Sequence, residues 1–293
     1  MVGASGAIGS ALVDHLLSLG ERPTPAGRNP EALAERWPGL PPARVDVLVP
    51  GTLVEPLAAV DVAYYLVHSM GAGAAFRARD REGATNFARA AASAGVRRIV
   101  YLGGLGRDDD DLSAHLSSRH ETGRILAEHG PEVVELRAGI VIGARSASFR
   151  MLHDLVRRLP VMIVPRWVDT RTQPIAIADV VRYLSAARHV ATSEHHTIVE
   201  VGGPDVLTFR EMMLTLARKE GRRPLILGVP VLTPRLSAMW CGLTTSVSVD
   251  VARPLVLGMR NETVVRDERA ATLFPQIRPM SFDQAIERAL AGA

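Results

Sequence analysis

The first nine residues contain a glycine pattern that can bind phosphate. Gly3, Gly6 and Gly9 stand in the sequence GASGAIG, which is followed at once by the helix-period segment SALVDHLLSLG. Glycine lets the backbone turn tightly and approach a phosphate, and the free N–H groups of the first helical turn can then hold the anion. The pattern predicts a loop that binds the pyrophosphate of a dinucleotide. The alternative is a plain glycine-rich turn.

Two further residues predict the adenosine end of the same site. Arg28, in GRNP, stands where the adenosine ribose should lie, and Asp46, in VDV, is placed to receive the adenine amino group. NAD-selective sites usually carry an acidic residue at the ribose, whereas a guanidinium suits a 2′-phosphate. We therefore predict NADP as the cofactor, with NAD as the alternative, and a solvated loop arginine as the remaining interpretation.

Alternating elements must position these residues. Apolar runs rich in Val, Ile and Tyr predict strands, and segments with helical period predict helices between them. The expected strands are 22–26, 43–49, 60–68, 97–105 and 133–143, and the expected helices are 10–20, 29–37, 76–95 and 115–130. This alternation implies an α/β fold with a doubly wound parallel sheet that is covered by helices on both faces.

The rhythm changes after Gly143 and predicts a smaller C-terminal substrate lobe. Helix caps are expected at Asp179 and at Thr208, where Glu211 completes a capping box, and a capped helix SFDQAIERALAG closes the chain. Residues 224–262 resist assignment. We expect residues 1–150, with 174–202 returning to them, to form the nucleotide-binding core. Residues 151–173 and 203–293 are expected to form the lobe.

Composition excludes several classes of protein. The net charge of +3 comes without a dense basic run, so we expect no nucleic-acid partner. No apolar stretch is long enough for an integral membrane segment. One cysteine, Cys241, leaves no disulfide framework and favours a cytoplasmic location. His195 and His196 lack a third ligand, and the acidic run 108–111 is interpreted as a solvated loop, so no metal site is predicted.

The motifs together resemble a known superfamily. GASGAIG, GRNP, VDVAYYLVHS, RRIVYLGGLG and ELRAGIVIG fall in the order and spacing of the extended and atypical short-chain dehydrogenase/reductases. HLSSRHETG, TRTQPIAIADV and VGGPDVLTFREMM are similar to the YbjT-like, NmrA-related branch, which binds NAD(P)H. The resemblance covers essentially the whole chain. It implies a Rossmann-type fold with the cofactor across the carboxyl ends of the strands.

The resemblance also implies which residues contact the cofactor. Five lie at the phosphates, three at the adenosine end, and the others along the central strands, near the nicotinamide or at the ribose. In chain order they are Gly3, Ser5, Gly6, Ala7, Ile8, Arg28, Asp46, Val47, Leu66, Val67, His68, Leu102, Gly103, Arg119, Ala138 and Gly139.

The catalytic pair of the superfamily does not carry over. Its chemistry uses a Tyr-x-x-x-Lys pair, and Lys219, the sole lysine, has no tyrosine four residues before it. Aligning SSRHETGRIL with the helix that carries the pair puts His115 at the tyrosine and Arg119 at the lysine. A histidine can move a proton near neutral pH, and Arg119 can hold ribose hydroxyls or phosphate. The alternative is that both are polar residues beside the cofactor without a role in proton transfer.

Four residues resemble family positions that line the substrate cleft: Arg166, Trp167, Arg171 and Gln173. We expect them to cap the nicotinamide, with a role in the core or at the surface as the alternative. Ser146 and Ser148 are candidates either for the substrate cleft or for capping the next helix. Met239 and Trp240 favour packing or a homodimer contact over a ligand site.

Two hypotheses about function remain open. The first is an oxidoreductase or epimerase-like enzyme that acts on an unknown small molecule. The second is a non-catalytic redox sensor or regulatory binder of NAD(P), as in NmrA-like relatives. Only Met1 and Val2 precede the glycine loop, whereas relatives carry a central strand there. The sequence therefore predicts a start codon assigned too late, and the alternative is a shortened site that binds cofactor poorly.

Overall fold

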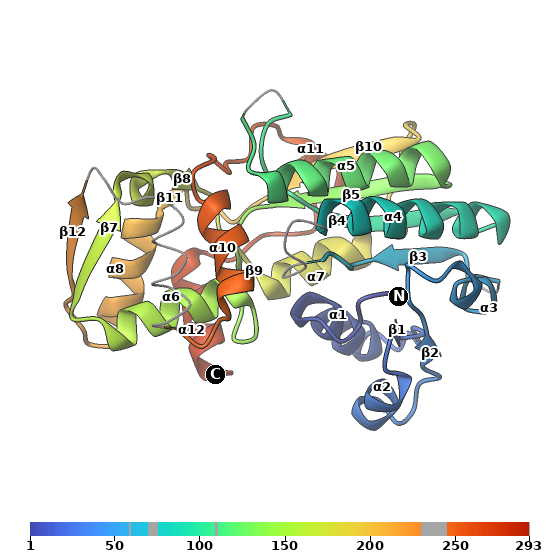
Figure 1. The fold of residues 1–293 in the computed structure, drawn as a ribbon, viewed down its shortest axis with the longest axis horizontal. Helices are drawn as coiled ribbons and strands as arrows, with labels where there is room; N and C mark the ends of the chain where they lie inside the picture. Colours follow the sequence, from blue (N-terminus) through green and yellow to red (C-terminus); the bar gives the residue numbers. More distant parts are fainter. Residues whose placement is uncertain (59, 70–75, 109–110, 230–244, 293) are drawn as a thin grey trace.

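A parallel sheet forms the centre of the computed structural model, which describes residues 1–58, 60–69, 76–108, 111–229 and 245–292 (Figure 1). Four strands pair in the order β10-β5-β4-β3. They are β3 (Val62–Tyr65), β4 (Arg98–Gly104), β5 (Glu132–Ala138) and β10 (His196–Val201). Every residue of β4 is buried, as expected for a central strand with helices on both faces. The predicted α/β fold class is confirmed.

The N-terminal residues connect this sheet to two short strands. These are β1 (Ala26–Gly27) and β2 (Ala43–Arg44), which pair in parallel. Val2 forms single parallel bridges to Ala26 on one side and to Tyr65 on the other. Its amide donates to the carbonyl of Tyr64 at 3.0 Å. One residue, Val2, therefore holds the central position of the sheet, between β1 and β3.

A cavity of about 660 Å³ opens in the sheet below Val2. Within a strand, the backbone N–H and C=O groups of successive residues point to opposite sides, and the carbonyl of Tyr64 faces Val2. The amide of Tyr64 and the carbonyl of Val62 therefore face the cavity. The amino group of Met1 lies at its top, where it donates to the carbonyl of Thr24 at 2.8 Å. Burial lowers the pKa of that amino group to about 5.

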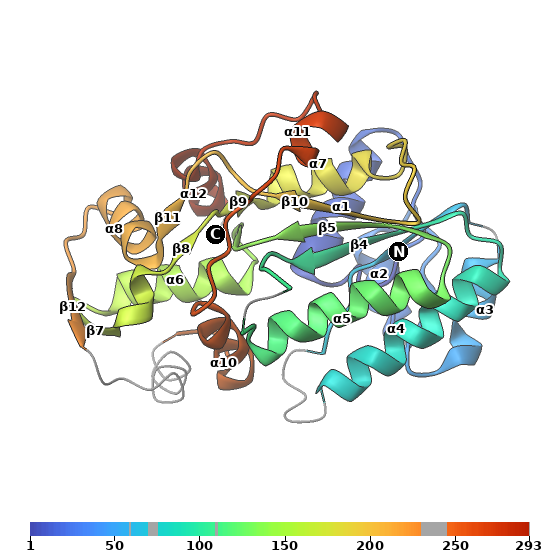
Figure 2. The ribbon, with the colours of Figure 1, turned by 90° about the horizontal axis from the view of Figure 1, so that it is seen from above.

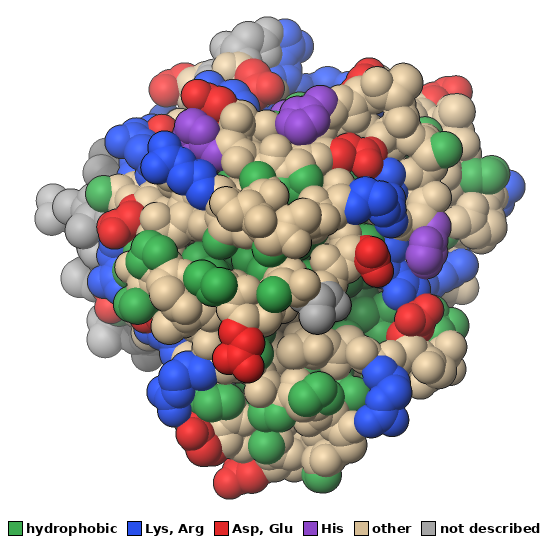
Figure 3. Space-filling model, turned by 90° about the vertical axis from the view of Figure 1, so that its right-hand side faces the viewer, with side chains coloured by type: hydrophobic (Ala, Val, Ile, Leu, Met, Phe, Trp, Pro, Cys, Tyr) green, Lys and Arg blue, Asp and Glu red, His purple; other side chains and the backbone are tan. Residues whose placement is uncertain are grey.

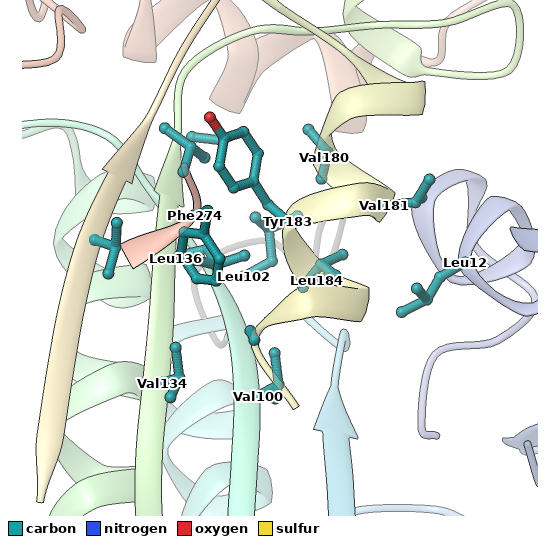
Figure 4. Close-up of a cluster of buried hydrophobic side chains, with 14 of the residues drawn as sticks. Leu12, Val100, Leu102, Val134, Leu136, Val180, Val181, Tyr183, Leu184 and Phe274 are labelled. Atoms are coloured by element: carbon teal, nitrogen blue, oxygen red, sulfur yellow. The ribbon is translucent and has the colours of Figure 1, made fainter. Parts of the chain in front are cut away.

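Helices cover both faces of the sheet (Figure 2). One face carries α1 (Ala7–Ser18) and α7 (Ile177–Ala186), and the other carries α4 (Phe76–Ser93) and α5 (Ala114–His129). Figure 4 shows the first of the two interfaces, where Leu12 of α1 and Leu184 of α7 pack toward Leu136 of β5. All three side chains are buried, so this layer fixes the first helix against the sheet.

The smaller lobe contains a hydrophobic cluster of its own, which includes Phe149, Phe209, Met212 and Ile286. The strands outside the central sheet in this half of the chain are β6 (Val141–Ile142), β7 (Val161–Pro165), β8 (Arg171–Thr172), β9 (Ile175–Ala176), β11 (Leu207–Thr208) and β12 (Leu225–Val229). The further helices are α6 (Ala147–Arg158), η3 (Arg166–Asp169), α8 (Phe209–Lys219), α10 (Val249–Gly258), α11 (Arg269–Leu273), which packs against β10, and α12 (Phe282–Ala291). Elsewhere the chain forms α2 (Pro30–Arg36), η1 (Pro50–Thr52) and α3 (Val54–Leu57). The bounds predicted for the two lobes stay a prediction.

Local sequence signals predicted several helix starts correctly. Capping boxes begin α8 at Thr208 and α12 at Ser281. The cap predicted at Asp179 is wrong: α7 begins at Ile177, and Asp179 lies within its first turn. There the buried carboxylate accepts the amide of Met280 at 2.8 Å. A tertiary hydrogen bond to the chain before α12, and not a cap, therefore explains this aspartate.

Candidate nucleotide-binding site

The glycine loop has the tight geometry that the pattern predicts. Gly3 has φ +84°, and a Cβ there would lie 2.5 Å from the carbonyl oxygen of Leu66. A Cβ on Gly9 would lie 2.2 Å from the carbonyl oxygen of Gly3. Gly3 therefore allows the backbone to turn with a positive φ, and Gly9 allows α1 to approach the loop closely. Both spacings fit the glycine roles in dinucleotide-binding loops.

The amino end of α1 is open to an anion. Its N-cap is Gly6, and no side chain in the described part of the chain caps the first turn. The amides of the first turn therefore keep their capacity to donate, and the helix dipole adds positive potential at the same point. Arg145 lies beside this end, since its guanidinium is 3.5 Å from the hydroxyl of Ser10 in α1. The sequence reasoning missed Arg145, which follows directly after the strand segment GIVIG.

One pocket of about 670 Å³ runs from this loop across the carboxyl ends of the strands. Most of the predicted cofactor residues line it: Gly3, Gly6, Ala7, Ile8, Leu66, His68, Leu102, Gly103, Arg119, Ala138 and Gly139. The structure thus gathers residues from α1, β4, α5 and β5 around one space. Of the other predicted positions, Ser5 is exposed, and Val67 packs partly buried against the core between the sheet and α4.

The predicted adenosine residues lie at the carboxyl ends of the two short strands. Arg28 follows β1 and is exposed, and its guanidinium makes no hydrogen bond or ion pair with the described residues. Asp46 follows β2, and its carboxylate accepts the amide of Leu48 at 3.0 Å. The carbonyl of Val47 accepts from the side-chain amide of Asn86, and this hydrogen bond joins the turn to α4. These three residues lie outside the wall of the pocket.

His115 and Arg119 both reach the pocket from α5. The ring of His115 packs 5.8 Å from the ring of His68, centroid to centroid. Burial, together with the positive charge of Arg119, lowers the pKa of His115 to about 4, and the same causes hold the pKa of His68 well below its usual range. Both imidazoles are therefore neutral at neutral pH. Arg119 is bound by its guanidinium to the carbonyl of Leu102.

Of the four predicted substrate residues, Arg171 and Gln173 have described side chains, and neither lies in the wall of this pocket. Gln173 donates to the carbonyl of Gly203 at 2.6 Å and accepts the amide of Val265 at 2.9 Å, so its side chain holds the lobe together. Arg171 is exposed in β8, and Arg166 and Trp167 belong to η3. Their role toward a substrate stays a prediction.

Other sequence candidates have clear positions. Ser146 caps α6 by accepting the amide of Phe149 at 3.3 Å, and it also lines the pocket with Ser148. The cap predicted for Ser146 is therefore present, and a contact with substrate stays a prediction. Met239, Trp240 and Cys241 lie outside the described residues, as do residues 109 and 110 of the acidic run.

Surface and composition features can also be compared with expectation. On the face shown in Figure 3, basic and acidic side chains are interspersed. Among the described helices, none is long and apolar enough to cross a membrane. Over the same residues, no group of three or more His, Cys, Asp or Glu side chains could hold a metal ion.

The family comparison agrees with the pocket. Residues 3–138 match the model of a family described as NAD(P)H-binding. This part of the chain is therefore similar to NAD(P)H-binding domains, and the match ends at Ala138, where β5 ends. A search of curated protein sequences gives no match.

Solved structures share the fold over nearly the whole chain. The UDP-glucose 4-epimerase of Thermotoga maritima, with UDP-glucose, is 12% identical with a TM-score of 0.74, covering 99% of this chain and 96% of that one. A nucleoside-diphosphate-sugar epimerase of Staphylococcus aureus is 17% identical with a TM-score of 0.75, covering 98% of both chains. The Bordetella bronchiseptica enzyme WbmH, in complex with NAD⁺, is 15% identical with a TM-score of 0.72, covering 99% and 96%.

At these identities the solved structures establish the fold alone. The fold and the family match over residues 3–138 are consistent with the atypical short-chain dehydrogenase/reductase superfamily that the motifs resemble.

Proposed function

We propose that the protein is an NADP-dependent enzyme, of the oxidoreductase or epimerase-like kind, that acts on a small molecule. One observation supports this most: the pocket that begins at the glycine loop continues past Gly139 and ends between helices α6, α8 and α10. A second ligand bound there would lie beside the nicotinamide end of a cofactor held by the loop. A bound nicotinamide nucleotide would supply the donor or acceptor of a hydride.

The preference for NADP rests on Arg28. Its guanidinium lies at the carboxyl end of β1 without a partner among the described residues, so it can form a bidentate hydrogen-bonded ion pair with a 2′-phosphate. Asp46 is already bound to its own turn through the amide of Leu48, yet its other oxygen can accept from an adenine amino group. NAD is the alternative cofactor.

His115 is the candidate for proton transfer. A neutral imidazole in the pocket can accept a proton from a substrate hydroxyl, and with a pKa of about 4 the ring is seldom protonated at neutral pH. His115 would therefore act as the base when an alcohol is oxidised. Arg119, fixed by the carbonyl of Leu102, can position ribose or substrate oxygens near this ring.

A non-catalytic sensor of NAD(P), as in NmrA-like proteins, is the second candidate. It is favoured by the same two residues, because a histidine with a pKa of about 4 and an arginine replace the proton-transferring tyrosine and lysine. In this case the pocket would discriminate the oxidised from the reduced nucleotide without turnover.

Titration calorimetry tests the proposal directly. We expect NADP⁺ and NADPH to bind more tightly than NAD⁺ and NADH, and Arg28→Glu to reverse that order. Equal affinities for NADP and NAD in both proteins would refute the assignment of Arg28. Absence of heat with all four nucleotides would refute the function itself.

A turnover assay separates the two candidates. Carbonyl compounds with NADPH, alcohols with NADP⁺, and nucleotide sugars form the panel. His115→Ala should abolish any turnover, whereas His129→Ala, on the same helix but away from the pocket, should not. Tight cofactor binding without turnover in the wild type would favour the sensor.

The remaining assignments belong to the same proposal. We assign the protein to the cytoplasm, with a small-molecule substrate and no nucleic-acid partner. A homodimer is the proposed alternative to a monomer. The lobe formed by residues 151–173 and 203–293 is proposed to close the substrate side of the pocket over the core formed by residues 1–150 and 174–202.

A further inference from the structure

The part of the pocket farthest from the glycine loop has a wall of hydrocarbon and thioether groups. We name this part the apolar arm. Its wall includes Met151 of α6, Phe209 and Met212 of α8, and Val251, Leu255 and Met259 of or directly after α10. The first three are at most 3% exposed. Three helices that are distant in the sequence thus converge on one apolar space.

Of the charged residues in the pocket wall, two lie at the cofactor end and one, Arg150, lies in α6 next to Met151. The charged residues of the wall are Arg119, Arg145 and Arg150, and no carboxylate is found among its described residues. Arg119 and Arg145 lie beside β4 and α1, at the cofactor end. Arg150 is exposed, and its guanidinium donates to the hydroxyl of Ser246 at 2.9 Å. The arm itself therefore offers no carboxylate to bind a cation or a sugar.

Few hydroxyl groups are available inside the arm. Ser146 already donates to the carbonyl of Val141 at 2.8 Å and accepts the amide of Phe149. Ser148 and Ser248 line the pocket from the first turn of α6 and the N-cap of α10. A sugar carries a hydroxyl on nearly every carbon, and each one left without a partner in this wall would cost free energy. A hydrocarbon group gains free energy from the same surroundings.

We infer that the apolar arm binds the hydrocarbon part of the substrate. The substrate is then an alcohol or carbonyl compound with an alkyl chain or an apolar ring, and not a nucleotide sugar. This inference rests on the proposed function, because the cofactor end must hold the reacting carbon. Three methionines in the wall suit such a ligand, since their flexible side chains adapt to irregular apolar shapes.

A chain-length series tests the inference. Straight-chain methyl ketones from butanone to octanone are titrated into the NADPH-saturated protein, with UDP-glucose as the polar probe. Each added methylene should lower the dissociation constant about threefold, because it transfers apolar surface from water into the arm. A dissociation constant that does not change with chain length, or tighter binding of UDP-glucose than of octanone, would overturn the inference.

A matched pair of variants places the effect in the arm. Val251→Asp puts a carboxylate into its wall and should remove the dependence on chain length. Val249→Asp, on the same helix with Val249 43% exposed and outside the pocket, should keep it. If Val251→Asp unfolds, Ser148→Phe, which narrows the arm from α6, should weaken octanone more than butanone. Equal weakening of both ketones would count against the arm.

The cofactor is titrated separately, so the two proposals fail independently. Ketones that bind with the expected dependence on chain length, while NADPH does not bind, would refute the proposed function and support the inference about the apolar arm. NADPH binding with a flat ketone series would refute the arm and keep the cofactor site.

Discussion

Substituting alanine for Gly9 tests the contact on which the nucleotide site depends. The added Cβ would lie 2.2 Å from the carbonyl oxygen of Gly3 and 2.9 Å from the Cα of Ala4, and both are backbone atoms. Ordinary contact begins at 3.4 Å, so the difference of 3.4 and 2.2 Å requires helix α1 and the loop to separate by 1.2 Å. No side-chain rotation can relieve this overlap.

That displacement is large compared with the tolerance of a hydrogen bond. Amide–oxygen bonds lie within about 2.7–3.2 Å, so a shift of this size breaks at least one bond from the loop to a bound phosphate. A hydrogen bond to a charged group contributes about 1.5–3 kcal/mol. At about 1.4 kcal/mol per tenfold change, Gly9→Ala should weaken NADP binding about 10- to 150-fold.

The assay is titration calorimetry with NADP⁺, accompanied by thermal unfolding without ligand. Gly39→Ala is the control, because a Cβ there meets no atom within 4 Å and Gly39 is outside the pocket. The control should bind NADP⁺ as the wild type does. If a folded Gly9→Ala protein binds NADP⁺ within twofold of the wild type, the main-chain amides at α1 do not hold the pyrophosphate.

Three further perturbations follow from buried groups. The folded-state pKa of His115, about 4, lies below its ordinary value of 6.5, so the unfolded chain binds a proton more readily than the folded chain. The free energy of unfolding should therefore fall by up to about 3 kcal/mol as the pH decreases from 6.5 to 4. In urea unfolding, His115→Gln should remove this loss. Two apolar residues added before Met1 should pair with Tyr64 and Val62 and raise the unfolding free energy by about 2 kcal/mol; an unchanged melting temperature would contradict this. Asp179→Asn should cost about 1–3 kcal/mol, because the buried Asp179 accepts from both the amide of Met280 and the guanidinium of Arg182, and asparagine keeps one acceptor oxygen. The exposed Asp283→Asn, which weakens a surface ion pair with Lys219, should cost less than about 1 kcal/mol.

The elements that local rules determine could be predicted from the sequence. Asn29 accepts the amide of Ala32 at 3.1 Å, as its position before Pro30 indicated, and the long apolar segments became β3, β4 and β5. The first short strand was predicted at 22–26 but forms at Ala26–Gly27. Its position depends on the bridge from Val2, a tertiary contact without a local signal.

The glycine loop of the pocket could also be predicted from the sequence, because its geometry constrains the backbone. Gly3 and Gly9 are needed for close approach whatever the neighbouring side chains are, so their spacing survives as a pattern. The apolar half had no such pattern. Helix α10 contains Pro254 and apolar residues on several faces, and it reaches the pocket because it packs beside α5 and α6.

The proposed replacement of tyrosine and lysine by His115 and Arg119 would change what the site can do. A lysine lowers the pKa of a tyrosine toward neutrality, whereas burial and the charge of Arg119 move the pKa of His115 away from it, to about 4. The guanidinium of Arg119 is held by the carbonyl of Leu102. In the proposed reaction, proton transfer would therefore begin from a neutral base in apolar surroundings. A substrate hydroxyl that lies against that ring, with its hydrocarbon part in the apolar arm, is the arrangement that both halves of the pocket can satisfy together.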